Sequence, residues 1–319
     1  DGMRDGPDYF GSTLYYPTDA EGPFSSIVLV PGFISPEFAV STWGPYLASH
    51  GIIVMTIGTN TLTDLPEDRA NALLDAVQTL QEENDRENSP VYQQIDVNKI
   101  SVGGHSMGGG GAQIAATMDN SLKSVISLNP WIQQSVVDYD YLNHPVPHLI
   151  ISGQDDTVAI VNNHANVHYD YTPNTTPKAI YEIENGNHST GRFPSTANNY
   201  VGKIVLSWLN YFADDNNCYF PLILEYPEQA SIYQNNLETF SVNDNQYSLI
   251  NFYPNPVIDF ISLRSNFNKN EKYLIVNNLG QIVLDGEIKN NLEIINLNYL
   301  SPGIYMLKVK NNTFKIIKK

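Results

Sequence analysis

The chain has 319 residues, 42% of them hydrophobic, which suffices for one large domain plus a small one or for two of medium size. Its formal net charge of −17 argues against nucleic acid and anionic membranes as partners. No run of about 18 apolar residues occurs, so we expect no membrane span. The single cysteine, Cys218, excludes an intrachain disulfide and any multi-cysteine metal site.

The first 215 residues alternate between strand and helix patterns. Ser26–Val30 is continuously apolar, as expected of a strand buried on both faces of a parallel sheet. Pro66–Asn84 has apolar residues at helical spacing, with Asp64 placed to cap it. Further strands are expected at 13–16, 52–57, 99–102, 124–128, 148–152 and 179–183, and further helices at 40–49 and 200–212. This order predicts an α/β fold with a doubly wound, mostly parallel sheet.

The chain changes character beyond Asp214. Residues 214–249 are rich in Asn, Asp, Gln and Tyr without clear periodicity, which indicates surface excursion and linker. From Asn251 onward, short alternating runs separated by turns predict a small all-β sandwich. Residues 241–319 carry a formal charge of about +3, against about −20 for the rest. The predicted organisation is a catalytic domain at 1–235, a linker at 236–250 and a β-sandwich at 251–319.

The segment from Ile100 to Ala116 carries the strongest chemical signal. A short β-branched run ends in Gly104-His105-Ser106-Met107-Gly108, and a helical segment of small residues follows. This is the pattern of the nucleophile elbow of an α/β-hydrolase, in which a serine occupies the apex of a strained turn between strand and helix. The glycines on either side of the serine allow the turn to be tight.

The other members of a catalytic triad follow the serine in the order acid, then histidine. Asp156 comes after the strand at 148–152, and His188 comes after the strand at 179–183. The adjacent Asp155 competes for the acid role, and Asp156 is preferred because it directly precedes Thr157 and Val158. The remaining histidines fit no such loop and are interpreted as structural or exposed.

This arrangement implies nucleophilic catalysis. A serine hydroxyl becomes a good nucleophile when a neighbouring imidazole accepts its proton, and the acid holds the imidazole in the right tautomer. Two backbone N–H groups must stabilise the tetrahedral oxyanion. Met107, at the positively polarised start of the helix, is one candidate donor, and Phe33, in the loop after an early strand, is the other.

The chain resembles the polyester hydrolase family of bacterial cutinases and poly(ethylene terephthalate)-degrading esterases over roughly residues 10–215. The resemblance implies a lidless enzyme with a shallow groove, in which Phe33 and Trp131 bind an acyl or aromatic unit from opposite sides; plain core packing is the alternative for Trp131. The chain departs from the family at Phe33, often tyrosine, at Ser189, often aromatic, and in lacking a C-terminal disulfide. The matching motifs are Gly104–Gly111, Leu47–Gly51, Asn129–Trp131 and Asp156–Ala159.

The C-terminal part from about Phe252 resembles the sorting domain of the type IX secretion system of Bacteroidota. The resemblance implies recognition by the export machinery of the outer membrane, a secreted or cell-surface location, and a chain that begins at Asp1 after trimming. The alternative is a generic β-sandwich that binds substrate or stabilises the enzyme. The matching motifs are Tyr253–Pro256, Asn278–Gln281 and Leu300–Tyr305.

The first hypothesis is therefore a secreted serine hydrolase acting on carboxylic esters, including polyesters. A second keeps the triad but assigns a general lipase or small-molecule carboxylesterase. A third is a non-catalytic surface-binding protein on a hydrolase scaffold. No cofactor is expected, and no metal ligand is assigned. The sequence contains no twelve-residue calcium loop, and acidic surface clusters stay open as an alternative kind of Ca²⁺ site.

Overall fold

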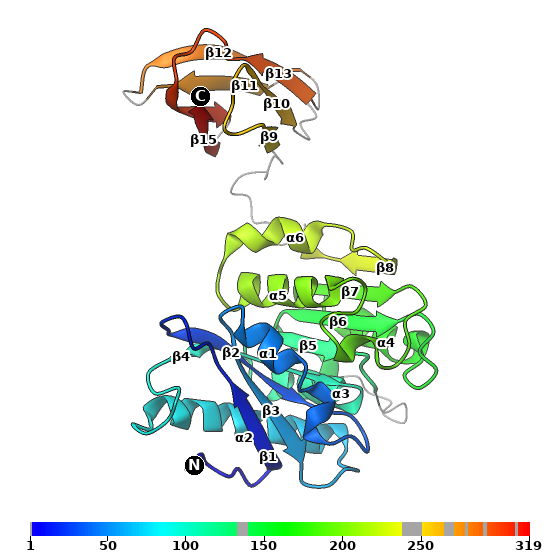
Figure 1. Ribbon diagram of the computed structural model, residues 1–319. Coiled ribbons are helices and arrows are strands. Elements are labelled where there is room, and N and C mark those ends of the chain that lie inside the picture. Colours follow the sequence, from blue (N-terminus) through cyan, green and yellow to red (C-terminus); the bar gives the residue numbers. More distant parts are fainter. Residues whose placement is uncertain are drawn as a thin grey trace. The chain divides into compact units, whose positions relative to one another are not determined.

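The computed structural model describes residues 2–132, 140–237, 251–264, 271–277, 280–289, 292–309 and 312–319. The chain forms two compact units, Asp1–Phe240 and Ser241–Lys319 (Figure 1). Each unit encloses its own cluster of buried apolar side chains. Most of the predicted linker at 236–250 lies outside the described residues.

The first unit is built on an eight-stranded sheet in the order β1-β3-β2-β4-β5-β6-β7-β8. The six inner strands are parallel, and the two outer strands run antiparallel to their neighbours. The predicted α/β class with a mostly parallel sheet is thus confirmed. The strands are β1 (Tyr9–Tyr15), β2 (Phe24–Val30), β3 (Ile53–Thr59), β4 (Ile95–His105), β5 (Val125–Leu128), β6 (His148–Gly153), β7 (Lys178–Ile183) and β8 (Ala230–Asn235).

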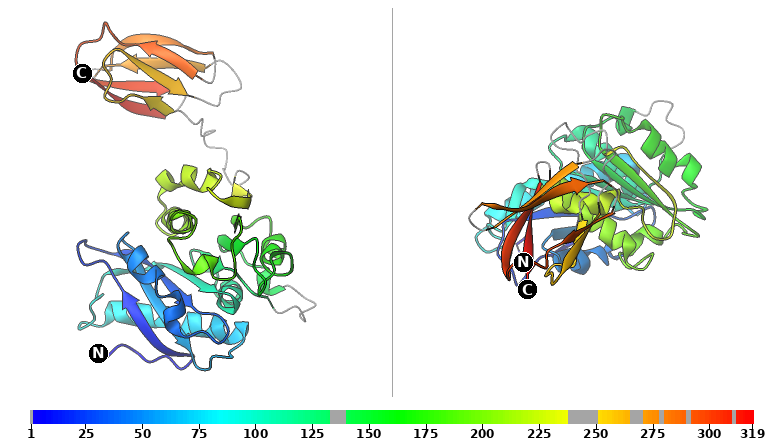
Figure 2. Two further views of the ribbon diagram at one scale, coloured as in Figure 1. Left: turned by 45° about the vertical axis from the view of Figure 1, so that its right-hand side comes forward. Right: turned by 90° about the horizontal axis from the view of Figure 1, so that it is seen from above.

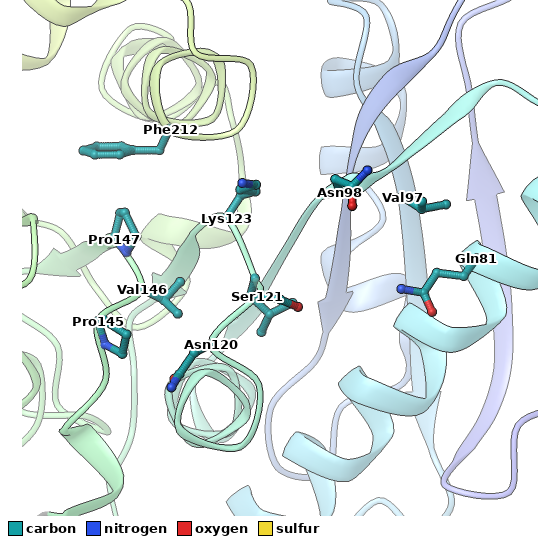
Figure 3. A pocket seen from close by; sticks show the side chains of 11 residues that line it. Gln81, Val97, Asn98, Asn120, Ser121, Lys123, Pro145, Val146, Pro147 and Phe212 are labelled. Carbon is teal, nitrogen blue, oxygen red and sulfur yellow. The ribbon is translucent and has the colours of Figure 1, made fainter.

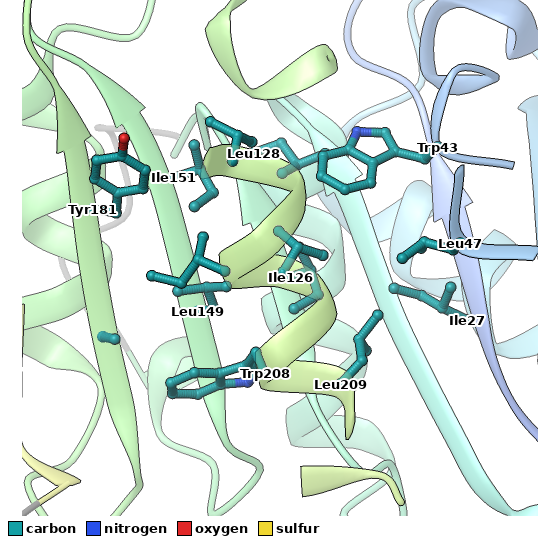
Figure 4. Close-up of a cluster of buried hydrophobic side chains, with 14 of the residues drawn as sticks. Ile27, Trp43, Leu47, Ile126, Leu128, Leu149, Ile151, Tyr181, Trp208 and Leu209 are labelled. Carbon is teal, nitrogen blue, oxygen red and sulfur yellow. The ribbon is translucent and has the colours of Figure 1, made fainter. Parts of the chain in front are cut away.

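Helices cover both faces of this sheet, because alternate residues of each buried strand point to opposite sides. Ile27 and Leu29 of β2 pack in one cluster with side chains of α1, α5 and α6, Trp208 of α5 among them (Figure 4). Val28 and Val30 of the same strand face α2 and α3. The helices are α1 (Trp43–Ala48), α2 (Pro66–Asp85), α3 (Met107–Met118), α4 (Ala165–Tyr171), α5 (Tyr200–Phe212) and α6 (Phe220–Leu224), with 3₁₀ turns η1 (Glu37–Val40), η2 (Asp140–Leu142), η3 (Val161–Asn163), η4 (Thr190–Arg192) and η5 (Asn217–Tyr219).

The start of α2 differs from the prediction that Asp64 caps it. Leu65 is the N-cap residue, and its N–H donates to the Asp68 carboxylate at 2.9 Å. The Asp64 carboxylate instead accepts the N–H of Thr61 at 3.1 Å. The reason is Pro66 at the first helical position, which forces the preceding residue into an extended conformation and so fixes Leu65 as the cap.

Residues 217–235 contain regular structure where the sequence indicated only surface excursion and linker. They form η5, α6 and the edge strand β8, which pairs with β7. The strand Ala-Ser-Ile-Tyr-Gln-Asn shows little hydrophobic pattern, because an edge strand is held mainly by its backbone ladder and keeps much of its side-chain surface in water.

The second unit consists of two antiparallel sheets, in the orders β13-β10-β9 and β12-β11-β14-β15 (Figure 2). Side chains from both sheets share one core, Ile261 and Leu263 from one and Ile275, Leu307 and Ile316 from the other. The predicted all-β class is confirmed. The strands are β9 (Asn251–Tyr253), β10 (Phe260–Arg264), β11 (Glu271–Val276), β12 (Ile282–Ile288), β13 (Leu292–Asn296), β14 (Gly303–Val309) and β15 (Asn312–Lys318).

None of the helices in the described part of the chain combines the length and the apolarity needed to cross a bilayer. Of the motif Asn278–Gln281, the first two residues lie outside the described ranges.

Candidate active site

Ser106 occupies the junction between β4 and α3. Its backbone has φ 56° and ψ −120°, in the left-handed half of conformational space, where a residue other than glycine is strained. A Cβ on Gly104 would lie 2.5 Å from the carbonyl of Gly108, and one on Gly108 would lie 2.4 Å from the carbonyl oxygen of Val30. Both glycines are therefore required for the turn to close against strand β2.

The structure brings the three predicted triad residues together at the carboxyl ends of parallel strands. Nε2 of His188, in the loop after β7, lies 3.0 Å from Oγ of Ser106. Nδ1 of the same ring lies 2.8 Å from Oδ2 of Asp156, in the loop after β6. Ser106 and Asp156 are buried, whereas His188 remains partly exposed. The imidazole thus bridges a shielded hydroxyl and a shielded carboxylate.

The Asp156 carboxylate is fully hydrogen-bonded. Oδ1 accepts the N–H groups of Val158 and Ala159 at 2.9 and 2.8 Å, and Oδ2 accepts from Asn129 as well as His188. Burial works to raise the pKa of Asp156, but the hydrogen bonds from His188 and the two backbone amides outweigh it and lower that pKa. The group is therefore ionised at neutral pH. Asp155, the competing candidate, has an exposed side chain.

Two polar residues hold the loop that carries His188: Asn129, to which sequence reasoning gave no role, and His105, which it interpreted as an orienting or packing residue of the elbow. Nδ2 of Asn129, directly after β5, donates to Asp156 at 3.1 Å and to the carbonyl of Asn187 at 3.2 Å, and its Oδ1 accepts the N–H of Gly191. Nε2 of His105 lies 2.7 Å from the carbonyl oxygen of His188. Burial lowers the pKa of His105 to about 3, so the ring is neutral and donates through Nε2. For Asn129, the signal available in the sequence was a polar residue at the end of a central strand.

Two backbone amides lie beside Ser106 without a protein acceptor among the described residues. Met107 begins α3, so its N–H has no partner within the helix. The loop after β2 passes against the serine, since a Cβ on Gly32 would lie only 2.7 Å from Cβ of Ser106. Phe33, the next residue, contributes the second free N–H. Both predicted donors therefore lie next to Ser106 in the chain or in space.

The ring of Trp131 is half-buried rather than part of the core. It stacks on His164 with ring centroids 5.7 Å apart and an interplanar angle of 26°. The Trp131 N–H donates to the carbonyl of Ser106 at 2.9 Å, which ties this segment to the elbow. His164 also accepts the N–H of Ile132 through Nδ1. The sequence did not predict that His164 would support the segment that carries Trp131.

Exposed apolar side chains follow the carboxyl ends of four of the parallel strands. They lie in the loops after β2, β3, β6 and β7, the same edge of the sheet that carries the triad. Single exposed apolar residues are ordinary, whereas a contiguous exposed apolar patch is typical of a binding surface. We call this set the apolar rim; it comprises Phe33, Ile34, Phe38, Leu62, Val158, Ile160 and Phe193.

The opposite edge of the sheet has a cavity of its own, with a volume of about 610 Å³ (Figure 3). Val97 near the start of β4, Lys123 before β5 and Pro147 before β6 line it. The cavity therefore lies at the amino ends of the strands, away from Ser106. Among the described residues, no group of three or more His, Cys, Asp or Glu side chains is arranged to hold a metal ion.

Comparison with known proteins gives a consistent result for both units. Residues 4–240 match the family described as PET hydrolase-like, and residues 251–319 match the secretion system C-terminal sorting domain. A bis(hydroxyethyl) terephthalate hydrolase from Streptomyces coelicolor is 37% identical over 221 residues, which cover 69% of this chain and 67% of that protein. Cutinase est1 of Thermobifida alba is 34% identical, covering 70% and 72% of the two chains. Cutinase 2 of Thermobifida cellulosilytica is also 34% identical, covering 71% and 83%.

Proposed function

The chain belongs to the PET hydrolase-like family, and from that premise we propose that it is a serine ester hydrolase that cleaves polyesters through a Ser106–His188–Asp156 acyl-enzyme mechanism. The observation that carries the proposal is the continuous hydrogen-bonded sequence from the Ser106 hydroxyl through His188 to Asp156. The type IX sorting domain marks the chain for export, so the reaction takes place at the cell surface or in the medium.

The reaction has two halves. His188 Nε2 takes the proton of Ser106 as Oγ attacks the ester carbonyl carbon, and the N–H groups of Phe33 and Met107 stabilise the resulting oxyanion. Collapse breaks the bond to the leaving alkoxide, which takes the proton from His188. A water molecule then repeats the sequence on the acyl-enzyme and releases the acid. Throughout, the ionised Asp156 stabilises the imidazolium and keeps its Nδ1 protonated.

The apolar rim favours an extended apolar ester over a small soluble one. Phe38 and Ile34, 72% and 62% exposed, provide apolar surface that a small soluble ester would not need. Association with a solid polymer buries such side chains, each worth up to about 2 kcal/mol when fully removed from water. The names of the relatives, cutinases and a terephthalate-ester hydrolase, support the same substrate class. A general lipase or small-molecule carboxylesterase is the second candidate.

A substitution on the apolar rim separates these candidates. We expect Phe38→Ser to lower hydrolysis of an amorphous polyester film several-fold while leaving kcat/KM for p-nitrophenyl butyrate within about two-fold. Met118→Ser is the matched control, because Met118 is also exposed (56%) but lies at the far end of α3 from Ser106. Equal loss of film activity in both variants, or equal loss on both substrates for Phe38→Ser, would favour the small-ester enzyme.

Removal of residues 241–319 tests the role of the second unit. Because the first unit has its own core and contains the triad, we expect the truncated protein to keep kcat/KM for soluble esters and its rate on film within about two-fold. Secretion from the native host should be lost, as measured by the enzyme's partition between cells and medium. A large fall in the film rate alone would assign the β-sandwich to substrate binding instead of export.

A further inference from the structure

Arg69 is a completely buried cation whose function the mechanism above does not explain. It lies on α2 with 0% of its surface exposed, and no carboxylate of the described residues lies within ion-pair distance. Burial lowers the pKa of Arg69 to about 10, so the guanidinium is still charged at neutral pH. A buried charge without a counter-ion is costly unless hydrogen bonds compensate it, and here all the hydrogen bonds go to backbone carbonyls.

Those carbonyls belong to two loops at the catalytic edge of the sheet. Nη1 donates to Pro31 O at 2.8 Å, in the loop that continues into Gly32 and Phe33. Nε donates to Asp64 O at 3.1 Å and Nη2 to Leu62 O at 3.4 Å, both in the loop between β3 and α2. The planar guanidinium therefore fixes the first loop against the second.

The loop Pro31–Phe33, which we call the oxyanion loop, also packs closely against the start of α3. A Cβ on Gly108 would lie 2.6 Å from Pro31 O, the same atom that Arg69 holds. A Cβ on Gly111, one turn further along α3, would lie 2.8 Å from Cβ of Arg69, so this glycine lets the arginine pass between the helices. Leu62 O also accepts the N–H of Ile34 at 2.8 Å, directly after Phe33. Phe33 thus lies between Pro31 and Ile34. Pro31 O is bonded to Arg69 directly, and the Ile34 N–H is bonded to Leu62 O, which also accepts from Arg69.

We propose that Arg69 is a positioning residue that holds the Phe33 N–H at the place of the developing oxyanion. The inference rests on the proposed function, since it assigns Arg69 to the donor of that mechanism. A donor displaced by a fraction of an ångström loses much of its effect on the transition state and little on substrate binding. Arg69 should therefore contribute to kcat far more than to KM.

The test compares Arg69→Lys and Arg69→Gln with wild type in the full chain. We expect kcat for p-nitrophenyl butyrate to fall about 10- to 100-fold with KM within about two-fold. The affinity for benzeneboronic acid, which forms a tetrahedral adduct with serine and presents an oxygen to the same amides, should fall by the same factor. Thr79→Ala is the matched control, because Thr79 is equally buried on α2 but bonds to Arg4 and Tyr9 instead of the loop. It should lower the melting temperature and leave kcat and boronate affinity unchanged.

The outcomes distinguish the inference from the function on which it rests. Folded Arg69 variants with unchanged kcat, or with reduced kcat and unchanged boronate affinity, would overturn the positioning role while the esterase assignment stands. If neither variant folds, Arg69 serves the fold rather than the loop and the proposal also fails. Absence of ester hydrolysis in wild type and in Thr79→Ala alike would reject the proposed function itself.

Discussion

Ser106→Ala is expected to lower kcat for ester hydrolysis by about 10⁴- to 10⁶-fold, the largest effect of any single substitution considered. Alanine cannot form the acyl-enzyme, and the activity that remains comes from the oxyanion donors and substrate binding alone. The loss should appear equally with p-nitrophenyl butyrate and with polyester film. An initial burst of p-nitrophenol when the wild type reacts with excess substrate, absent from the variant, checks the covalent step directly.

The fold should survive this change. The substituted side chain is small, and it leaves intact the backbone contacts of the elbow that fix the turn, including the Ser106 carbonyl's bond to Trp131. The melting temperature should therefore stay within a few degrees of wild type. Retained turnover in a folded Ser106→Ala protein would refute Ser106 as the nucleophile. Absence of ester hydrolysis in the wild type as well would favour the third hypothesis, a non-catalytic surface-binding protein.

The parts of the site that were predictable depend on strong local rules. The α/β-hydrolase pattern fixes the chain order of the triad and the sheet edge at which it lies. It requires a serine between two glycines at a strand end, an acid after a later strand and a histidine after the last parallel strand. The structure places His188 within hydrogen-bond distance of both Ser106 and Asp156, because the parallel strands that precede the three residues all end at the same edge of the sheet. The central strands could be predicted for a similar reason. Because both faces of the sheet are buried, these strands appear in the sequence as continuous apolar runs.

The residues that sequence reasoning missed act through contacts that no local pattern encodes. In the sequence, Arg69 looks like an ordinary polar residue of an amphipathic helix. In the structure it donates to Pro31 O, in a loop far away along the chain, and to Asp64 O, in the loop directly before its own helix. His105 and Asn129 become meaningful only once the His188 loop folds back over both. The edge strand β8 was missed for a related reason, since its pairing with β7 needs backbone groups rather than apolar side chains.

The behaviour of the remaining histidines could not be anticipated from sequence either. His144, His148 and His168 lie together around His148, the first residue of β6, with ring centroids of successive pairs 6.0 and 6.3 Å apart. All three are buried, as is His105. Burial lowers the pKa of His144 to about 4, and those of His105 and His168 to about 3. The pKa of His148 is lowered by burial and by the neighbouring charges that His144, His168 and Lys178 carry when protonated.

Depressed histidine pKa values make the folded protein sensitive to acid. The unfolded chain protonates each histidine near pH 6.5, while the native state keeps it neutral down to about pH 4 or 3. The unfolded state therefore binds more protons over this window, and stability present above pH 6.5 is lost as the pH falls. At pH 5 the loss is about 2 kcal/mol per histidine, or about 6 kcal/mol for His105, His144 and His168 together.

We accordingly expect the first unit to have a melting temperature about 10–20 °C lower at pH 5 than at pH 8, since the total stability of such a unit is of the order of 5–15 kcal/mol. Tryptophan fluorescence follows this unit alone, because all three tryptophans lie in it. His168→Gln should lower stability at pH 8 but reduce the slope of the unfolding free energy between pH 6 and pH 4 by about 1.4 kcal/mol per pH unit, the contribution of one proton. Thr79→Ala should shift the curve without changing its slope. An unchanged slope in His168→Gln would mean that His168 is not a source of the acid sensitivity.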